Sequence, residues 1–216
     1  MTEEITVKGI VLSVSPQSEY NKRVMLITDR LGKICVFAQG AAKQNSKLIG
    51  KLRPMTAASF KLSKGRSAYN LHGVELIDSF YELSKDLEGS LYGIYFLEMA
   101  EYFAQEGMEE GEAKRMLNLL YVSLRALREG KLGRKLIRAI FELRLLVIEG
   151  EYDERPPSEE EPGLLRIWEH VITSPLSGLF SEEIFADEKA DEGFIREALL
   201  MSRRICRHDF RSLSLL

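Results

Sequence analysis

The spacing of apolar residues changes once along the chain, and this change divides the sequence into two parts. Up to residue 80, short runs rich in β-branched residues alternate between apolar and polar positions, which predicts β-strands. From residue 84 the apolar residues recur every three or four positions, which predicts amphipathic helices. We therefore expect an α+β protein, with a β domain over residues 1–80 and an all-α helical domain over residues 81–216.

The first part is expected to form five strands. They cover residues 5–14, 22–28, 34–38, 58–62 and 67–78. Between the second and third strands, Gly32 supplies the positive φ angle that a tight hairpin needs. Short antiparallel strands in this number have the dimensions of a five-stranded OB-fold barrel, although the pattern alone does not separate it from an SH3-like barrel.

The second part is expected to form a helical bundle. The predicted helices cover residues 84–107, 112–129, 134–149, 164–173 and 193–208, with Ser84 as the first N-cap and a further short helix starting at Ser181. The 134–149 segment is apolar around most of its circumference, which is typical of a helix buried at the centre of a bundle. Three prolines and a run of glutamates over residues 150–163 predict an exposed loop.

Charge is distributed unevenly between the two parts. Residues 1–80 hold 12 Lys and Arg against 6 Asp and Glu, a net charge of +6. Residues 81–216 hold 18 against 27, a net charge of -9. Such an asymmetry indicates a polyanionic partner for the first part, and the alternative is a chance distribution of solvated charges.

The cations of the first part concentrate in residues 36–54, which we call the basic connection; it contains no acidic residue. A cationic connection on a small barrel is suited to hold a phosphate backbone, and neighbouring aromatic rings can stack on bases. The candidate DNA-binding residues are Tyr20, Lys22, Arg23, Lys43, Lys47, Lys51, Arg53, Lys64 and Arg66. Lys8 and Lys61 are better explained as charges that protect a strand edge, and Phe37 as a core residue.

Two further charged features lie in the helical part. Near its end, Arg203, Arg204, Arg207 and Arg211 form a second basic cluster, which either complements a helix dipole or docks an acidic peptide or DNA. Glu98 and Arg144 each fall among apolar residues, where a charge needs a partner. We expect these two side chains to form a structural ion pair between their helices.

Signatures of catalysis and of cofactor binding are missing from the sequence. Gly50-Lys51 resembles the end of a phosphate-binding P-loop, but Asn45 and Leu52 replace the early glycine and the magnesium-binding hydroxyl. The histidines and the two cysteines have no metal-ligand spacing. We expect a protein that is not an enzyme, with no cofactor and no metal. Without a long apolar run or a signal peptide, it is expected to be cytoplasmic and nucleoid-associated, with no membrane partner.

Short motifs that resemble the RecO family of bacterial DNA repair and recombination mediators run in order over nearly the whole chain. They are Gly9-Ile10-Val11-Leu12, Glu19, Leu26-Ile27-Thr28-Asp29, Gly32-Lys33, Ala38-Gln39-Gly40-Ala41, Ser46-Lys47-Leu48, Gly50-Lys51-Leu52-Arg53-Pro54, Phe96-Leu97-Glu98-Met99, Phe141-Glu142-Leu143-Arg144-Leu145-Leu146, Gly150-Glu151-Tyr152 and Phe210-Arg211-Ser212-Leu213. No single motif is decisive, but the ordered set is specific.

The resemblance implies an N-terminal OB fold, a C-terminal helical domain, binding of single- and double-stranded DNA, and annealing of complementary strands. It also implies partnership with RecR and contact with the acidic C-terminal tail of the single-stranded-DNA-binding protein, so that RecA can be loaded. Many family members carry a four-cysteine zinc site after the central helix. Here residues 151–162 contain no cysteine, so the helical domain is expected to lack the zinc site.

Two functional hypotheses follow. In the first, the protein is a DNA-binding mediator whose barrel neutralises the phosphates of two strands, so that complementary bases can meet. In the second, the barrel is an OB-fold protein-interaction module that binds an acidic protein tail, and its contact with DNA is incidental. The two hypotheses differ in the salt dependence of DNA binding and in whether complementary strands anneal.

Overall fold

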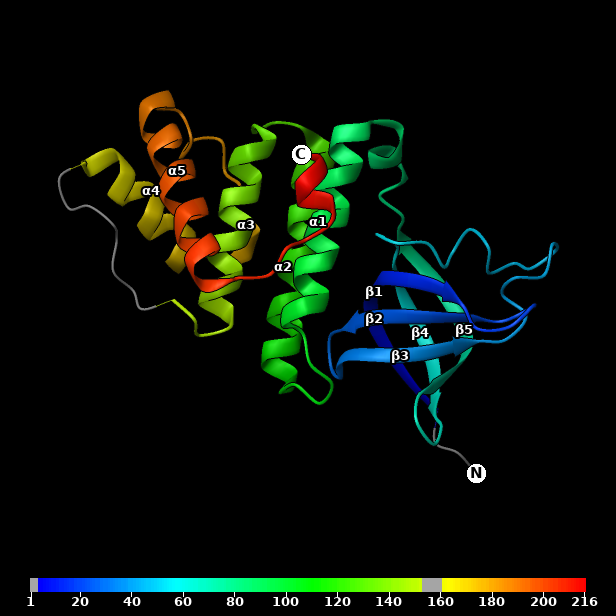
Figure 1. The fold of residues 1–216 in the computed structure, drawn as a ribbon. Helices are drawn as coiled ribbons and strands as arrows, with labels where there is room; N and C mark the ends of the chain where they lie inside the picture. The colour runs from blue at the N-terminus through cyan, green and yellow to red at the C-terminus, as the bar shows by residue number, and fades with distance from the viewer. Residues whose placement is uncertain (1–3, 153–160) are drawn as a thin grey trace.

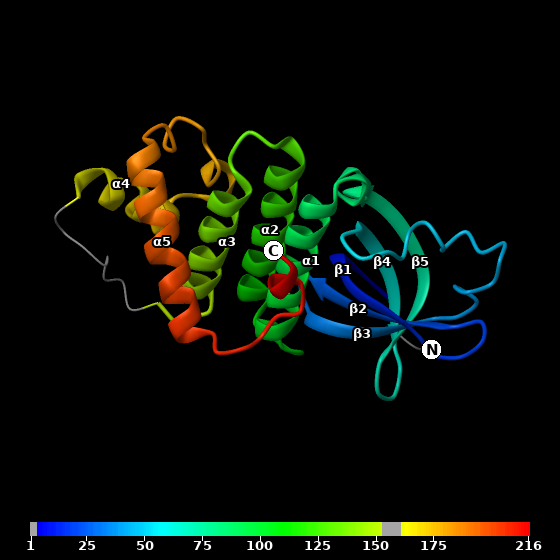
Figure 2. The same cartoon turned by 45° about the horizontal axis from the view of Figure 1, so that its top comes forward.

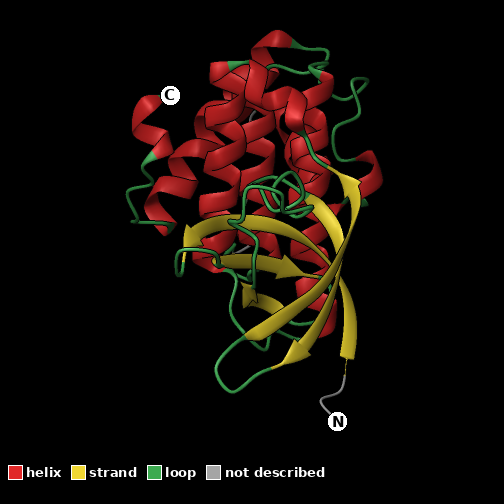
Figure 3. Cartoon of the chain, turned by 90° about the vertical axis from the view of Figure 1, so that its right-hand side faces the viewer, coloured by secondary structure: helices red, strands yellow, loops and turns green. Residues whose placement is uncertain are grey.

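A β-barrel and a helical bundle lie side by side in the computed structural model, which describes residues 4–152 and 161–216 (Figure 1). The strands curl around one another below the helices when the molecule is viewed from the barrel side (Figure 3). The α+β organisation expected from the change in apolar spacing is confirmed.

The strands close into a barrel in the order β1-β2-β3-β5-β4. Their bounds are β1 (Glu4–Pro16), β2 (Lys22–Thr28), β3 (Gly32–Ala38), β4 (Ala57–Lys64) and β5 (Tyr69–Asp78). β1 pairs antiparallel with both β2 and β4, and a short parallel pairing of Val36 and Phe37 in β3 with Tyr69 and Asn70 in β5 closes the seam. This order confirms the predicted five-stranded OB fold.

Alternation along β3 shows how the barrel core forms. Ile34, Val36 and Ala38 point inward and are buried, whereas Cys35 and Phe37 are only half-buried on the outside. The prediction that Phe37 is a core residue is therefore wrong. Its position is a consequence of the two-residue period, which places every second side chain of a strand on the opposite face.

The helical part follows β5 after one short 3-10 helix (Figure 2). Its elements are η1 (Tyr81–Lys85), α1 (Leu87–Phe103), α2 (Glu110–Glu129), α3 (Arg134–Ile148), α4 (Pro162–Thr173), η2 (Leu176–Gly178), α5 (Glu188–Ile205) and η3 (Ser212–Leu215).

The helix starts differ from the prediction at three places. Ser84 lies inside η1, where its hydroxyl donates to the Tyr81 carbonyl at 2.7 Å, and Asp86 takes the N-cap position of α1. The segment that starts at Ser181 is a turn rather than a helix. α5 begins earlier than predicted because the Asp187 carboxylate accepts hydrogen bonds from the backbone N–H groups of its first turn.

α3 is the buried centre of the bundle, as its apolar circumference predicts. One charged pair is buried with it: the Arg138 guanidinium lies 2.6 Å from the Glu142 carboxylate, which also accepts a 2.6 Å hydrogen bond from the Tyr95 hydroxyl. Burial, reinforced by the Glu142 carboxylate, raises the pKa of the Tyr95 phenol. Burial alone would lower the pKa of Arg138, but Glu142 more than offsets this effect and raises it.

The predicted ion pair between Glu98 and Arg144 is wrong. Glu98 accepts hydrogen bonds from the backbone N–H and the hydroxyl of Ser212, at 3.2 Å and 2.7 Å. Arg144 donates to the carbonyls of Val171, Ile172 and Ser174 at and after the end of α4. The guanidinium satisfies helix-terminal carbonyls that have no partner within their own helix, and so does not need a carboxylate.

Apolar contacts join the barrel to the bundle. Ile10, Leu12 and Ile27 point out of the barrel and belong to the same buried cluster as the helices, whereas a second cluster fills the barrel itself. The Lys33 ammonium adds a 2.6 Å hydrogen bond to the Glu101 carbonyl of α1. Because the helical core extends into the strands, the division of the chain into domains at residue 80 stays a prediction.

Substitution of Gly32 by alanine tests the hairpin beside this junction. Gly32 has a φ angle of +66°, and an added Cβ would collide with the Gln105 carbonyl. We expect Gly32→Ala to lower the free energy of unfolding by at least about 2 kcal/mol, measured by urea denaturation. Gly50→Ala is the control, because a Cβ at Gly50 meets no atom within 4 Å. Equal stability of the two variants would contradict the packing described here.

A second test concerns Glu149, the residue that follows α3. Burial raises the pKa of its carboxyl from 4.5 to about 7, and the nearby carboxylates of Glu112 and Glu151 add to the effect. The folded state holds this proton more tightly than the unfolded state. The resulting stability is fully present below pH 4.5 and is lost as the pH rises through 7.

We therefore expect Glu149→Gln to lose less stability than the wild type between pH 5 and pH 8, measured by urea unfolding at both values. Glu169→Gln, at an exposed position of α4, is the control and should follow the wild type. If the free energy of unfolding changed with pH in the same way for the wild type and Glu149→Gln, the folded structure would not raise the pKa of this carboxyl.

Candidate nucleic-acid interface

Two loops meet at the end of the barrel that lies away from the helices (Figure 1). One is the loop over residues 17–21 between β1 and β2, and the other is the basic connection. The backbone N–H of Ala42 donates to the Tyr20 carbonyl at 3.0 Å, and the Lys43 ammonium lies 5.9 Å from the centre of the Tyr20 ring. The structure therefore brings together two candidates that are far apart in sequence.

The basic connection is a series of turns held at several points. Gly40 has a φ angle of +67°, and its N–H donates to the Asn21 side-chain oxygen at 2.9 Å. Leu52 is 2 % exposed and anchors the connection in the barrel core. Lys51 is half-buried, and its ammonium donates to the Val74 carbonyl at 3.1 Å, so this lysine ties the connection to β5.

Other cations of the connection face solvent. Lys43, Lys47 and Arg53 are exposed, and no salt bridge involves them in residues 4–152 and 161–216. Lys61, by contrast, lies 2.6 Å from the Glu4 carboxylate of β1. Because β4 pairs with both β1 and β5 in the closed barrel, the strand-edge role expected for Lys61 is wrong. Three cations of the connection can therefore receive an anion without first breaking an ion pair.

The outer face of β2 and β3 continues this surface. Arg23 and Phe37 are direct cross-strand partners, and the Arg23 Nε donates to the Cys35 sulfur at 3.3 Å. Lys22 is half-buried at the start of β2. The face of strands 2 and 3 and the adjoining loops are where OB folds bind oligonucleotides. We call the following set the basic loop surface: Tyr20, Lys22, Arg23, Phe37, Lys43, Lys47 and Arg53.

The remaining barrel candidates, Lys64 and Arg66, are exposed on the hairpin between β4 and β5. The hairpin is closed by a 2.9 Å hydrogen bond from the Gly65 N–H to the Ala68 carbonyl, and the strand after it starts beside Phe37. Sequence reasoning missed Phe37 as a surface ring. The signal that would have found it is the two-residue period of a strand, which places Phe37 on the same face of β3 as Lys33.

The second basic cluster lies on a different part of the molecule. Arg203 and Arg204 end α5, which packs at the far side of the bundle from the barrel (Figure 1). Arg207 and Arg211 are exposed on the segment that returns to α1. In this segment the His208 ring stacks on the Tyr102 ring, with 4.7 Å between the ring centres. Only the first two arginines can complement the dipole of α5.

Among the described residues, no group of three or more His, Cys, Asp or Glu side chains has the geometry to hold a metal ion. Most of the segment in which relatives are expected to carry zinc ligands, residues 153–160, lies outside the described residues. No helix in the described part of the chain is long and apolar enough to cross a bilayer.

Comparison with known proteins agrees with this geometry. Residues 1–80 match the family model described as "Recombination protein O N terminal". The chain is similar to "DNA repair protein RecO" of Clostridium acetobutylicum, with 36% identity over 64% of this chain and 55% of the relative. The proteins of the same name from Clostridium novyi and Alkaliphilus metalliredigens are each 31% identical, over 66% and 68% of this chain.

The matched region spans 55% to 58% of the length of these three relatives. The family model covers the whole barrel, and a match of 146 residues is longer than the barrel, so it also includes helical residues. The resemblance expected from the ordered motifs in the sequence is thereby confirmed: the chain is similar to proteins of the RecO family, and its barrel matches that family's N-terminal model.

Proposed function

We propose that this chain is a DNA-binding protein of recombinational DNA repair that holds DNA on the basic loop surface. The observation that carries the proposal is the meeting of Tyr20 with Lys43 at the end of the barrel, on the same surface as the exposed Arg23 and the half-buried Phe37. Cations on this surface neutralise phosphates, and the two rings provide faces on which bases can stack. The name that the relatives share, "DNA repair protein RecO", supports this proposal.

Annealing follows from the same electrostatics. Two complementary strands repel one another through their phosphates, and a surface with several unpaired cations lowers that repulsion when both strands bind. No covalent chemistry is required, so we propose a mediator without catalytic residues. Double-stranded DNA would be held by its phosphates alone, because its bases are not free to stack on the rings.

Protein partners are a further part of the proposal. We propose that the chain works with RecR to help load RecA on single-stranded DNA. The acidic tail of the single-stranded-DNA-binding protein would be bound by the exposed arginines at and after the end of α5, because a carboxylate-rich peptide needs cations that are free to pair. The net charge of -9 on residues 81–216 makes the helical part a docking platform rather than a main DNA site.

The alternative, a barrel that binds an acidic protein tail, depends on the same cations. The two hypotheses differ in the role of the aromatic rings. An acidic tail binds through its charge and has no base that could stack on a ring. The position of Tyr20 beside Lys43, and of Phe37 opposite Arg23, therefore favours nucleic acid.

Reversal of two loop charges tests the DNA site. We expect Lys43→Glu/Lys47→Glu to bind a labelled oligothymidylate at least tenfold more weakly, as measured by fluorescence anisotropy at several salt concentrations. The log–log slope against salt should become shallower by about 1.4, because each single-strand phosphate contact contributes about 0.7.

Lys114→Glu/Lys135→Glu is the matched control, since it makes the same change of charge at exposed positions of α2 and α3. An equal loss of affinity in both double variants would mean that net charge, and not the basic loop surface, governs binding.

Replacement of Tyr20 separates the two hypotheses. Loss of one stacked base costs about 1–3 kcal/mol, so Tyr20→Ala should weaken oligonucleotide binding between about fivefold and about 150-fold, and Tyr20→Phe should retain it. A labelled oligoglutamate peptide is measured in parallel and should bind more weakly than the oligonucleotide. If the peptide binds as tightly, and Tyr20→Ala changes neither affinity, the acidic-tail hypothesis replaces the DNA-binding one.

A further inference from the structure

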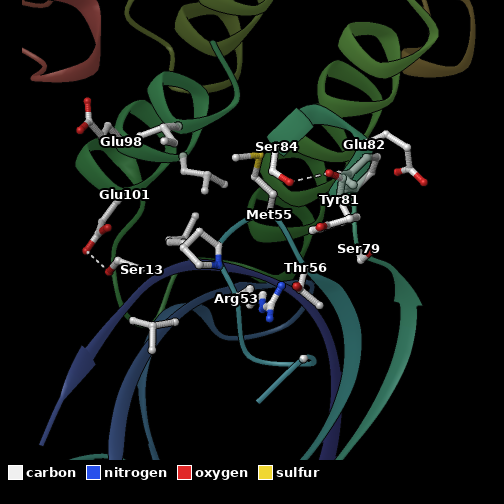
Figure 4. A pocket seen from close by; sticks show the side chains of 17 residues that line it. Ser13, Arg53, Met55, Thr56, Ser79, Tyr81, Glu82, Ser84, Glu98 and Glu101 are labelled. Carbon is white, nitrogen blue, oxygen red and sulfur yellow. Dashed lines mark hydrogen bonds between the residues drawn. The ribbon is translucent and has the colours of Figure 1, made fainter. Parts of the chain in front are cut away.

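A groove of about 910 Å³ lies between the barrel and α1 (Figure 4). Its apolar lining includes Leu12 of β1, Met55 after the basic connection, Phe80 after β5, and Ile94 and Leu97 of α1. The groove is separate from the basic loop surface apart from Arg53, which lines it at the barrel side. The proposed DNA site does not use its apolar wall.

Two residues of the lining have an unusual backbone. Met55 and Phe80 are the non-glycine residues with positive φ angles in the described part of the chain, at 67° and 43°. Both are held in place: the Met55 N–H donates to the Val11 carbonyl at 3.0 Å, and the Arg128 guanidinium lies 4.9 Å from the centre of the Phe80 ring. Backbone strain of this kind persists only where surrounding contacts maintain it, and it clusters at ligand-binding sites.

The rim of the groove is acidic. Figure 4 shows Glu98 and Glu101 on the α1 side and Glu82 on the opposite side, with Arg53 between them toward the barrel. Glu98 uses one carboxylate oxygen for Ser212, and Glu101 accepts one long hydrogen bond, of 3.5 Å. Three carboxylates against one guanidinium repel a phosphate backbone and attract a cation.

Arg53 marks the point where the sign of the charge changes. Arg53 also lines an adjoining hollow of about 500 Å³ next to the loop between β1 and β2. Lys22 is another residue of the lining of this hollow. A nucleic acid that follows the cations of the barrel therefore ends at Arg53, and the acidic groove beyond it is left to a ligand of opposite charge.

We infer that this groove binds an apolar segment of a partner protein that carries a lysine or arginine. Apolar side chains of the segment would rest on the exposed Tyr81 and Ile94, and its cation would pair with the glutamates of the rim. An apolar centre inside a charged rim is the arrangement of protein-binding sites, in which the centre supplies affinity and the rim supplies specificity. The inference does not depend on DNA binding by the barrel.

Peptide selection tests the inference directly. The full chain is immobilised, and a random peptide phage library is selected on it with counter-selection against the Ile94→Lys variant. Ile94 is 36% exposed on the wall, so a lysine there places a charge in the groove without disturbing buried packing. Leu87→Lys is the matched control on the same helix, because Leu87 is 79% exposed and does not line the groove.

The expected result is a set of peptides that combine apolar residues with lysine or arginine. They should bind the wild type and Leu87→Lys equally and bind Ile94→Lys at least tenfold more weakly. Glu82→Lys, a change at the exposed rim, should weaken the same peptides, whereas Glu169→Lys on α4 should not.

Three results would overturn the inference. The first is a selection that yields no peptide able to distinguish the wild type from Ile94→Lys, or only acidic peptides. The second is displacement of the peptides by an oligonucleotide in the Lys43→Glu/Lys47→Glu variant, which would make the groove a nucleic-acid site. The third is a dimer in sedimentation equilibrium that Ile94→Lys abolishes and Leu87→Lys does not, since a second copy of this chain would then be the occupant.

Discussion

The apolar junction between the barrel and the first two helices determines what the rest of the molecule can do. Ile10, Leu12 and Ile27 point outward from the barrel, and in isolation they would expose apolar surface to water. Packing α1 and α2 against them covers one side of the barrel and leaves the opposite end free. That free end is where the loop between β1 and β2 meets the basic connection, so the position of the basic loop surface is a consequence of the junction.

The same junction separates two kinds of charge. The exposed cations Lys43 and Lys47 lie on the basic connection, whereas Glu82, Glu98 and Glu101 surround the groove where barrel and bundle meet. Arg53 and Met55, two residues apart, belong to the two sides of this boundary. A chain with a net charge of only -3 can therefore present one surface suited to nucleic acid and another suited to a basic protein segment.

Local rules in the sequence predict much of this architecture. The number of strands follows from runs and turns, and the left-handed Gly32 and the buried α3 follow from turn chemistry and apolar spacing. Side-chain partners depend on the tertiary fold and could not be predicted in this way. Arg144 donates hydrogen bonds to carbonyls at the end of α4 and does not pair with Glu98. Lys51 donates to a carbonyl of β5 instead of pointing into solvent. The contact between Tyr20 and Lys43 likewise requires two loops to be placed together by the barrel.

Hydrogen–deuterium exchange of the full chain, with and without a saturating oligothymidylate, tests the central claim most directly. If the basic loop surface holds DNA, amides in residues 17–23 and 36–47 should exchange more slowly in the complex, and amides of α5 should not change. Protection confined to α5 and the residues that follow it, with the barrel loops unchanged, would contradict the account and move the DNA site to the second basic cluster.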